Sequence, residues 1–278
     1  MTAPTNPLEL DQALKALWGA QQMPFASAVA KPFASKNFID TTRRLEQLVH
    51  LRASGLLHGP NGVGKSLLVD CFLAQLPEKR FRCLHLSHSS LTGSDLLRQL
   101  CLALGQRPRM RRGDNLTLID QAWRELDRVW PVLVLEEAQN LSATALEEIR
   151  LLACHRRDTQ APFSLLLVGD EQLAPRLQMG INTPLLARLS FSLQLAAFTS
   201  EDAQAYLLAR LQEVGIRSDP FEPAARHLLL QAARGLPRQI NHLAQRAFEE
   251  AARQQTAAIT AAHLHGALAL MPWVAQQT

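Results

Sequence analysis

The sequence of 278 residues lacks any apolar run approaching the roughly 18–20 residues that a membrane-spanning helix requires. Its N-terminal segment, MTAPTNPLELDQALKALWG, carries acidic residues early and has no apolar stretch of the kind that forms the centre of a signal peptide. It also lacks internal repeats and low-complexity tracts. These absences lead us to expect a globular, cytoplasmic protein with no membrane partner.

Cysteine is scarce and scattered. The four cysteines, Cys71, Cys83, Cys101 and Cys154, form no Cys-x-x-Cys pair and have no His-rich segment beside them. A structural zinc site needs such close spacing. We therefore expect buried free thiols and no structural zinc, in keeping with a reducing cytoplasm.

Charge is modest in amount and uneven in position. Charged residues make up 19% of the chain and hydrophobic residues 47%, which is the balance of an ordinary globular protein. The net charge is +4, yet the segment from residue 199 onward is neutral, with seven arginines against seven acidic residues. Four arginines crowd into RPRMRR at residues 107–112, without an acidic residue among them. The positive excess therefore depends on this one segment.

From Phe33 onward, short apolar runs of β type alternate with helical patterns, which predicts parallel βαβ units. The strands show little alternation, so we expect a sheet covered on both faces. Helices are expected from Ser94–Asp95 to Gly105, and from a cap at Ser142 through Ile149. The expected strands are Gly55–His58, Cys83–Leu86, Val132–Leu135, Ser164–Val168 and Phe191–Leu195.

After Leu195 the strand patterns stop. Thr199 and Asp202 have the spacing of a helix cap, and helical patterns follow at about 200–214, 222–234, 237–254 and 260–270. The fold class is therefore α/β, a base with a parallel sheet flanked by helices, followed by a small all-α lid. The expected domains are an N-terminal extension (1–32), an α/β nucleotide-binding base (33–198) and an α-helical lid (199–278).

The strongest motif is GPNGVGKS at residues 59–66, between an apolar strand and an apolar helix. It matches the P-loop pattern G-x-x-x-x-G-K-[ST], in which glycines let backbone N–H groups point at phosphate oxygens. Lys65 is expected to reach the β- and γ-phosphates of ATP, and the Ser66 hydroxyl to bind Mg²⁺. The expected ATP-binding residues are Gly59, Pro60, Asn61, Gly62, Val63, Gly64, Lys65, Ser66 and Leu67.

A second motif, VLVLEEAQN at residues 132–140, is an apolar strand that ends in two acids. A P-loop enzyme needs one carboxylate there for Mg²⁺ and a neighbouring base for the attacking water. Glu136 fits the metal role and Glu137 the role of base. The first acid is usually Asp. Because Glu is one methylene longer, Mg²⁺ can sit differently or be held through water, and the rate of hydrolysis stays open.

With these motifs in place, the chain resembles the AAA+ superfamily and, more narrowly, the ExeA-like and TniB/TnsC-like ATPases that accompany bacterial transposases. The resemblance extends from about Pro32 to about Ala252. The stretches that carry it are PFASKNF, GPNGVGKS, VLVLEEAQNLS, LEEIRLL, LLLVGDEQL, LLARLSFSLQL and GLPRQIN.

The resemblance implies roles for further residues. Asp170 falls at the sensor 1 position, where the family more often has Asn, Thr, Ser or Gln; an ionised Asp cannot donate a hydrogen bond, so we expect it to orient water or a neighbour. Arg188 matches an arginine finger that reaches the next subunit's nucleotide, which implies an oligomer, and Arg238 matches sensor 2. Phe38 and Ile39, just before the Arg43–Arg44 helix, either cover the adenine or pack in the core.

The arginine cluster consists of Arg107, Arg109, Arg111 and Arg112, in a loop bounded by Gly105 and Gly113. In related transposition ATPases this part of each subunit grips the DNA backbone. Arginines on a mobile loop bind phosphates without reading bases. The alternative is a solvated loop without a function.

The sequence therefore predicts an ATPase, dependent on Mg²⁺, that assembles on double-stranded DNA as a ring or filament and recruits a transposase. Three alternatives stay open. One is an ExeA-like secretion ATPase, although such chains are longer and carry a membrane anchor and a peptidoglycan-binding part that this sequence does not show. The others are a helicase loader or replication initiator, and a nucleotide switch with little hydrolysis, which the departures at Glu136 and Asp170 allow.

Overall fold

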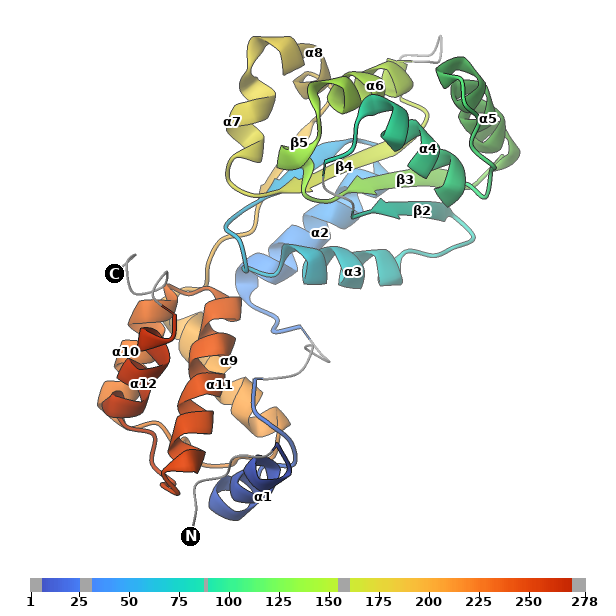
Figure 1. The fold of residues 1–278 in the computed structure, drawn as a ribbon. Coiled ribbons are helices and arrows are strands. Elements are labelled where there is room, and N and C mark those ends of the chain that lie inside the picture. Colours follow the sequence, from blue (N-terminus) through green and yellow to red (C-terminus); the bar gives the residue numbers. More distant parts are fainter. Residues whose placement is uncertain (1–6, 26–31, 88–89, 155–160, 272–278) are drawn as a thin grey trace. The chain divides into compact units, whose positions relative to one another are not determined.

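The computed structural model describes residues 7–25, 32–87, 90–154 and 161–271 (Figure 1). By their contacts the residues divide into two compact units. We call residues 36–61 and 65–195 the sheet unit, and residues 1–35, 62–64 and 196–278 the helical unit.

The sheet unit is built around five parallel strands in the order β2-β3-β4-β1-β5. The strands are β1 (Gly55–His58), β2 (Phe81–Leu86), β3 (Trp130–Leu135), β4 (Ser164–Gly169) and β5 (Phe191–Gln194). The helices are α2 (Lys36–His50), α3 (Lys65–Gln75), α4 (Gly93–Ala103), α5 (Arg112–Glu125), η1 (Ala138–Asn140), α6 (Ala143–Cys154), α7 (Leu173–Gln178), η2 (Gly180–Asn182) and α8 (Thr183–Leu186).

The sheet is covered on both faces, as the sequence predicts. All six residues of β4 are buried, as are the last five of β3. Figure 1 shows α2 and α3 on one face and α4 to α8 on the other. Leu56, Leu133 and Leu167 pack toward the second face, against residues of α4 to α8. Apolar contact on both faces explains why these strands read as continuous hydrophobic runs.

The register places the catalytic candidates at one edge. β1 pairs with β4 so that His58 lies opposite Gly169, and β3 pairs with β4 so that Leu135 lies opposite Leu167. Because all strands are parallel, their carboxyl ends meet at the same edge of the sheet, where ligands bind in open α/β folds. The P-loop and the acidic motif follow β1 and β3 at this edge.

Two of the three predicted helix caps are correct. Ser142 accepts the N–H of Ala145 (3.1 Å) at the start of α6, and Thr199 accepts the N–H of Asp202 (3.1 Å) at the start of α9. The third prediction was late by two residues, because Thr92 caps α4 by accepting the Asp95 N–H. In each case a hydroxyl satisfies a backbone donor that the helix cannot pair internally.

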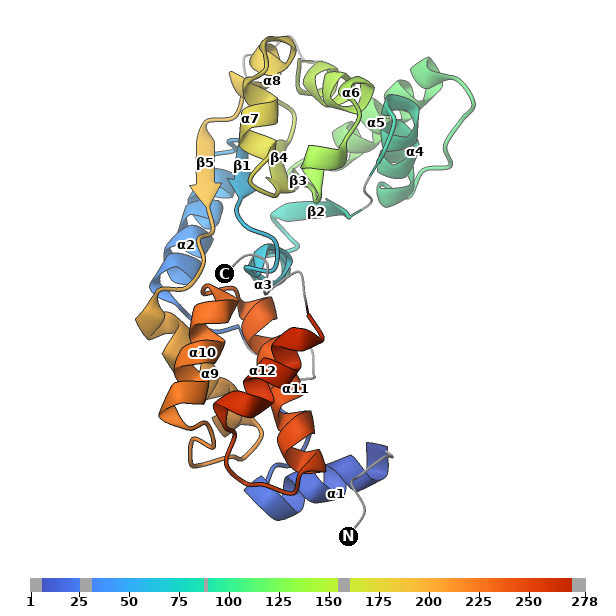
Figure 2. The ribbon, with the colours of Figure 1, turned by 60° about the vertical axis from the view of Figure 1, so that its left-hand side comes forward.

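The helical unit combines both ends of the chain. It contains α1 (Pro7–Trp18), α9 (Ser200–Glu213), α10 (Pro223–Ala233), α11 (Pro237–Arg253) and α12 (Ala261–Ala269). Helix α1 lies beside α11 in both views (Figures 1 and 2). The Trp18 ring meets Phe248 edge to face at 4.9 Å, and its indole N–H donates to the carbonyl of Ala257 (2.6 Å).

The unit boundaries differ from the predicted domains. Residues 1–32 were expected to form a separate extension, whereas α1 packs into the core of the helical unit. Phe33 was expected to begin the base, but its ring contacts Phe198 (5.5 Å) and Tyr206 (5.6 Å) in the helical unit. Aromatic packing therefore places the boundary after Ser35.

All four cysteines are free thiols. Cys101 is buried, Cys71 and Cys83 are half-buried, and Cys154 is exposed, so the expectation of burial fails for the last of them. Among the described residues, no helix is both long and apolar enough to cross a bilayer.

Candidate functional site

The P-loop connects β1 to α3, and the side chain of its lysine, Lys65, points toward the backbone of the loop. Lys65 is 8% exposed, and its ammonium donates to the carbonyls of Gly59 (2.9 Å) and Pro60 (3.0 Å). A Cβ at Gly59 would lie 2.1 Å from the Leu195 carbonyl oxygen, so no larger residue fits there. Gly64 has φ +107°, which other residues rarely adopt. The loop therefore has the tight backbone that phosphate binding requires.

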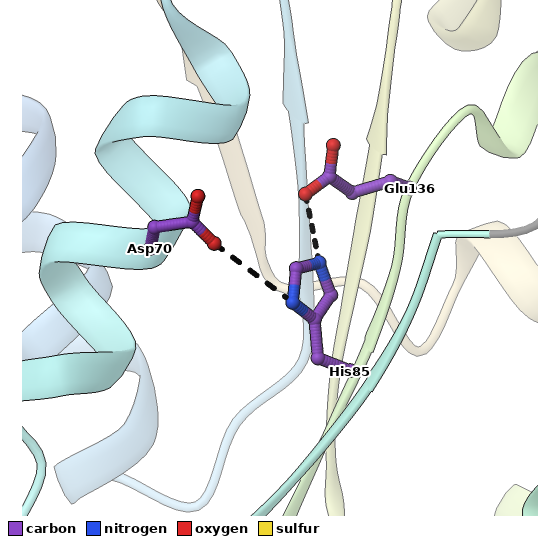
Figure 3. A group of neighbouring side chains, drawn as sticks. All are labelled: Asp70, His85 and Glu136. Atoms are coloured by element: carbon purple, nitrogen blue, oxygen red, sulfur yellow. Dashed lines mark hydrogen bonds and ion pairs between the residues drawn. The ribbon is translucent and has the colours of Figure 1, made fainter. Parts of the chain in front are cut away.

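The acidic motif meets the P-loop through Ser66 and Glu136. The Ser66 hydroxyl donates to one carboxylate oxygen of Glu136 at 2.5 Å, and His85 at the end of β2 donates to the other at 2.7 Å. Figure 3 shows the His85 ring between Glu136 and Asp70, whose carboxylate lies 3.9 Å from the other ring nitrogen. Because Glu136 can only accept, its contact identifies His85 Nε2 as the donor.

These contacts set the ionisation of the cluster. The hydrogen bond from His85, with smaller effects of Ser66 and Lys65, lowers the pKa of Glu136 against the opposing effect of burial. The same bond raises the pKa of His85, helped by the charge of Asp70. Glu136 is thus held as a carboxylate, although it is mostly buried.

The donor set fits Mg²⁺. A serine hydroxyl and a carboxylate in contact are the oxygen ligands that this ion prefers, and it commonly binds through one or two protein groups and phosphate oxygens. His85 and Asp70 were not anticipated from the sequence. His85 reaches the site only because β2 pairs with β3, which no local pattern reveals.

The expected base, Glu137, has a left-handed backbone conformation, with φ 51° and ψ 36°. Its carboxylate accepts a hydrogen bond from the Gln139 side chain at 2.7 Å. Asp170, at the end of β4, uses its carboxylate to accept the N–H of Gln172 (2.9 Å). Asp170 thus orients its own loop, and its backbone N–H donates to Gln139 (3.2 Å).

The two predicted arginines differ in position. Arg188 follows α8, is exposed, and donates to the Pro184 carbonyl (2.5 Å) of its own helix. Arg238 lies in the first turn of α11 and is also exposed. Within the helical unit, its backbone N–H donates to the carbonyl of Gly62 (3.2 Å). The roles of finger and sensor 2 stay predictions.

The adenine candidates, Phe38 and Ile39, lie inside α2 and not before it. Phe38 and Ile39 were placed just before the helix, but α2 begins at Lys36 and includes both. Phe38 is half-buried and Ile39 is 37% exposed. Neither is a residue of the fully packed core.

The arginine loop joins α4 to α5. Arg107, Arg109 and Arg111 are exposed. Asn115, which is 3% exposed, accepts the N–H of Arg109 (2.6 Å) and donates to its carbonyl (3.0 Å). The sequence suggested a mobile loop, whereas this pair of hydrogen bonds ties its centre to α5.

Arg112 is engaged within the sheet unit. It forms a bidentate ion pair with Glu148 of α6, with N···O distances of 2.6 and 2.8 Å. The pair raises the pKa of Arg112. It is therefore the least available of the four arginines for an external phosphate.

We expect Arg112→Ala to lower the free energy of unfolding by about 1–2 kcal/mol. The change leaves the Glu148 side chain, 12% exposed, without its partner; the loss stays below that of a fully buried pair because Arg112 is 47% exposed. Urea denaturation measures it. As a control, Arg124→Ala breaks the i,i+4 pair with the half-buried Asp120, in which the arginine is 71% exposed, and should cost about 0.5 kcal/mol or less. Equal losses in both variants would contradict a structural role for Arg112.

Comparison with known proteins agrees with this geometry. Residues 49–177 match the AAA domain family. Over 197 residues, 69% of this chain, the sequence is 30% identical to general secretion pathway protein A of Aeromonas hydrophila. The chain spans only 36% of the length of that relative.

Solved structures of similar fold include ORC proteins and a Holliday junction branch migration motor. The ORC2 protein of Aeropyrum pernix, solved as ADPNP–ADP complexes, has a TM-score of 0.64 at 16% identity, over 88% of this chain and 70% of that one. The ORC1 protein of the same organism, in complex with DNA, has a TM-score of 0.65 at 17% identity, over 86% and 66%. The RuvB branch migration motor of Thermotoga maritima has a TM-score of 0.57 at 18% identity, over 86% and 70%. At these identities the likeness concerns the fold alone: the five-stranded parallel sheet flanked by helices matches that of AAA+ P-loop ATPase structures, and residues 49–177 are the part that matches the AAA domain family.

Proposed function

We propose that this protein is an ATPase that binds double-stranded DNA in its ATP-bound state and serves DNA transposition by recruiting a transposase. Hydrolysis releases it from the DNA. The observation that carries the DNA-binding part is the loop with exposed Arg107, Arg109 and Arg111, centred on the Asn115 hydrogen bonds. The transposition part depends on the resemblance in the sequence motifs.

Nucleotide chemistry follows from the P-loop and the acids. Lys65 binds the phosphates, while Ser66 and Glu136 hold Mg²⁺, which neutralises charge on the phosphate oxygens. Glu137 accepts the proton of the attacking water. Arg188, exposed after α8, supplies positive charge to a neighbouring subunit in a homo-oligomer. A cytoplasmic location belongs to the same proposal.

DNA contact is supported by charge and its placement. Arg111 and Arg112 stand at the N-terminus of α5, where the helix dipole disfavours positive charge. Such an arrangement is stabilised by an anion, and the phosphates of a DNA backbone are anions that arginines neutralise without reading the bases. The fold-related ORC1 protein was itself solved in complex with DNA.

We expect a non-hydrolysable ATP analogue to promote cooperative binding to random-sequence duplex, and the triple variant Arg107/Arg109/Arg111→Ala to lose it. In a plot of the logarithm of the binding constant against the logarithm of salt concentration, any residual binding by the variant should give a shallower slope than the wild type. The slope should differ by about 0.9 for each phosphate that the variant no longer neutralises. Electrophoretic shift at several salt concentrations measures both. The control variant Arg82/Arg124/Arg128→Ala removes three exposed arginines and the same charge from other elements of the sheet unit.

If no nucleotide state binds duplex, or if both triple variants lose binding equally, the DNA-binding proposal fails. A second candidate then takes its place, an ATPase of a secretion pathway that acts on another protein. The 30% identity to general secretion pathway protein A favours it. The helicase loader, in contrast, shares DNA binding with the main proposal and is distinguished by whether a helicase or a transposase is co-purified.

A further inference from the structure

The segment after β3, residues 137–141, is held in one conformation by a hydrogen bond within it and by contacts with the end of β4 and with α7. Glu137 itself has φ 51°, a left-handed conformation that costs a residue with a side chain about 1 kcal/mol or more. Such a conformation persists only where the surroundings impose it. Neighbouring groups must therefore hold the backbone of Glu137, the expected base, in this conformation.

The first group is the side-chain amide of Gln139. Its oxygen accepts the backbone N–H of Asp170 (3.2 Å). Because a backbone N–H can only donate, the oxygen of the amide and not its nitrogen must face Asp170. The NH₂ group then faces Glu137 and donates to its carboxylate at 2.7 Å. One amide thus connects the base to the end of β4, with its orientation set by the chemistry of both partners.

The second observation is the space that the amide occupies. A Cβ added to Gly169, the last residue of β4, would lie 2.6 Å from the Gln139 side-chain oxygen. It would also lie 2.8 Å from a methyl group of Leu173. A glycine at this strand end leaves the room that the amide needs.

The third contact comes from Arg176 of α7. Its guanidinium donates to the backbone carbonyls of Gln139 and Leu141, on both sides of the turn. The carbonyl of Arg176 in turn accepts the side-chain N–H of Asn182 (2.9 Å), a residue that is 9% exposed. The segment is therefore fixed to α7 through its backbone and to β4 through Gln139.

We propose that Gln139 is a positioning residue for Glu137, an inference that rests on the proposed ATP hydrolysis. By occupying one carboxylate oxygen of Glu137, the amide restricts the side chain to one orientation and leaves the other oxygen to accept a proton. Arg176 holds the backbone on which both side chains stand. The side-chain hydrogen bonds of Gln139 are with Glu137 and Asp170, so we expect its replacement to affect hydrolysis and not nucleotide binding.

The test compares hydrolysis with binding in Gln139→Leu, which keeps a similar volume without hydrogen bonds. We expect kcat to fall about 10–100-fold, the range that follows when a catalytic group is misplaced by up to about 1 Å. KM and the affinity for a non-hydrolysable ATP analogue should stay within about threefold, since a positioning effect concerns the reaction and not ground-state binding. Gln178→Leu, at an exposed position of α7, serves as the matched control.

Two further variants separate the parts of the network. Gln139→Glu keeps an acceptor for the Asp170 N–H but cannot donate to Glu137, so its kcat should fall at least as far as that of Gln139→Leu. Gly169→Ala displaces the amide from the neighbouring strand and should lower kcat with analogue affinity unchanged. Thermal unfolding of each variant verifies that the fold is intact.

A kcat for Gln139→Leu within twofold of the wild type, or a loss of kcat matched by an equal loss of analogue affinity, overturns the inference and leaves the proposed ATPase standing. A wild-type protein that binds ATP with Mg²⁺ and does not hydrolyse it overturns both. The wild-type measurement therefore tells the two failures apart.

Discussion

Replacement of Glu137 by Gln is expected to slow ATP hydrolysis by about 10²–10⁴-fold while nucleotide binding persists. Gln has nearly the shape of Glu but cannot take a proton from water at neutral pH. Phosphate release under saturating ATP measures the rate, and a fluorescent nucleotide measures binding. The variant should therefore accumulate in its ATP-bound state, and under the proposed function it should stay on DNA longer than the wild type.

The control for this prediction is Glu125→Gln, which removes one negative charge at an exposed position of α5. Its rate should equal that of the wild type. If Glu137→Gln also hydrolyses ATP at the wild-type rate, Glu137 is not the base and Glu136 becomes the candidate. If ATP hydrolysis slows equally in both variants, the loss of rate comes from the change in net charge and not from the loss of a base.

Lys65→Met should weaken nucleotide binding strongly and slow hydrolysis. Lys65 is buried, and its ammonium donates to the carbonyls of Gly59 and Pro60, so it is already placed inside the loop that would surround the phosphates. Removing one partner of a buried, hydrogen-bonded charge pair costs about 2–5 kcal/mol, which corresponds to a loss of affinity of about 30-fold or more. Calorimetric titration with ATP and Mg²⁺ measures it.

Lys79→Met is the matched control, because Lys79 is exposed outside the P-loop. An affinity of Lys65→Met within threefold of the wild type would show that the loop binds nucleotide through its backbone alone. Thermal unfolding without nucleotide is needed beside the titration, since the methionine takes the ammonium donor from the buried carbonyl of Gly59 and the part-buried carbonyl of Pro60.

The two sharpest motifs could be predicted because their signals are local. The P-loop combines required glycines with a flanking strand and helix, and the acids follow an apolar run; both lie where expected, and Ser66 contacts Glu136. All five strands were found, with their starts misplaced by up to two residues at β2 and β3, where Phe81 and Trp130 begin the strands. Ends of strands depend on pairing with a neighbour, which the local pattern does not contain.

The residues that were missed act through tertiary contacts. His85 reaches Glu136 from β2, Asp70 reaches His85 from α3, and Gln139 contacts Asp170, which is 31 positions away in sequence. The availability of Arg112 was overestimated for the same reason, since its partner Glu148 is 36 positions away. Periodicity and spacing describe one segment at a time, so a hydrogen bond between distant segments has no signature in them.

The helical unit contains two segments that are far apart in sequence, and this separation affects its folding during synthesis. Trp18 is synthesised early, but the carbonyl of Ala257 that it binds comes 239 residues later. At ribosomal rates this is a delay of roughly 10–50 s. During that interval α1 lacks α11, and the apolar residues that it contributes to the core of the helical unit, such as Leu14, are open to chaperones or to neighbouring chains. The sheet unit lies between these two segments in sequence, so the helical unit completes its folding only after the sheet unit has been synthesised.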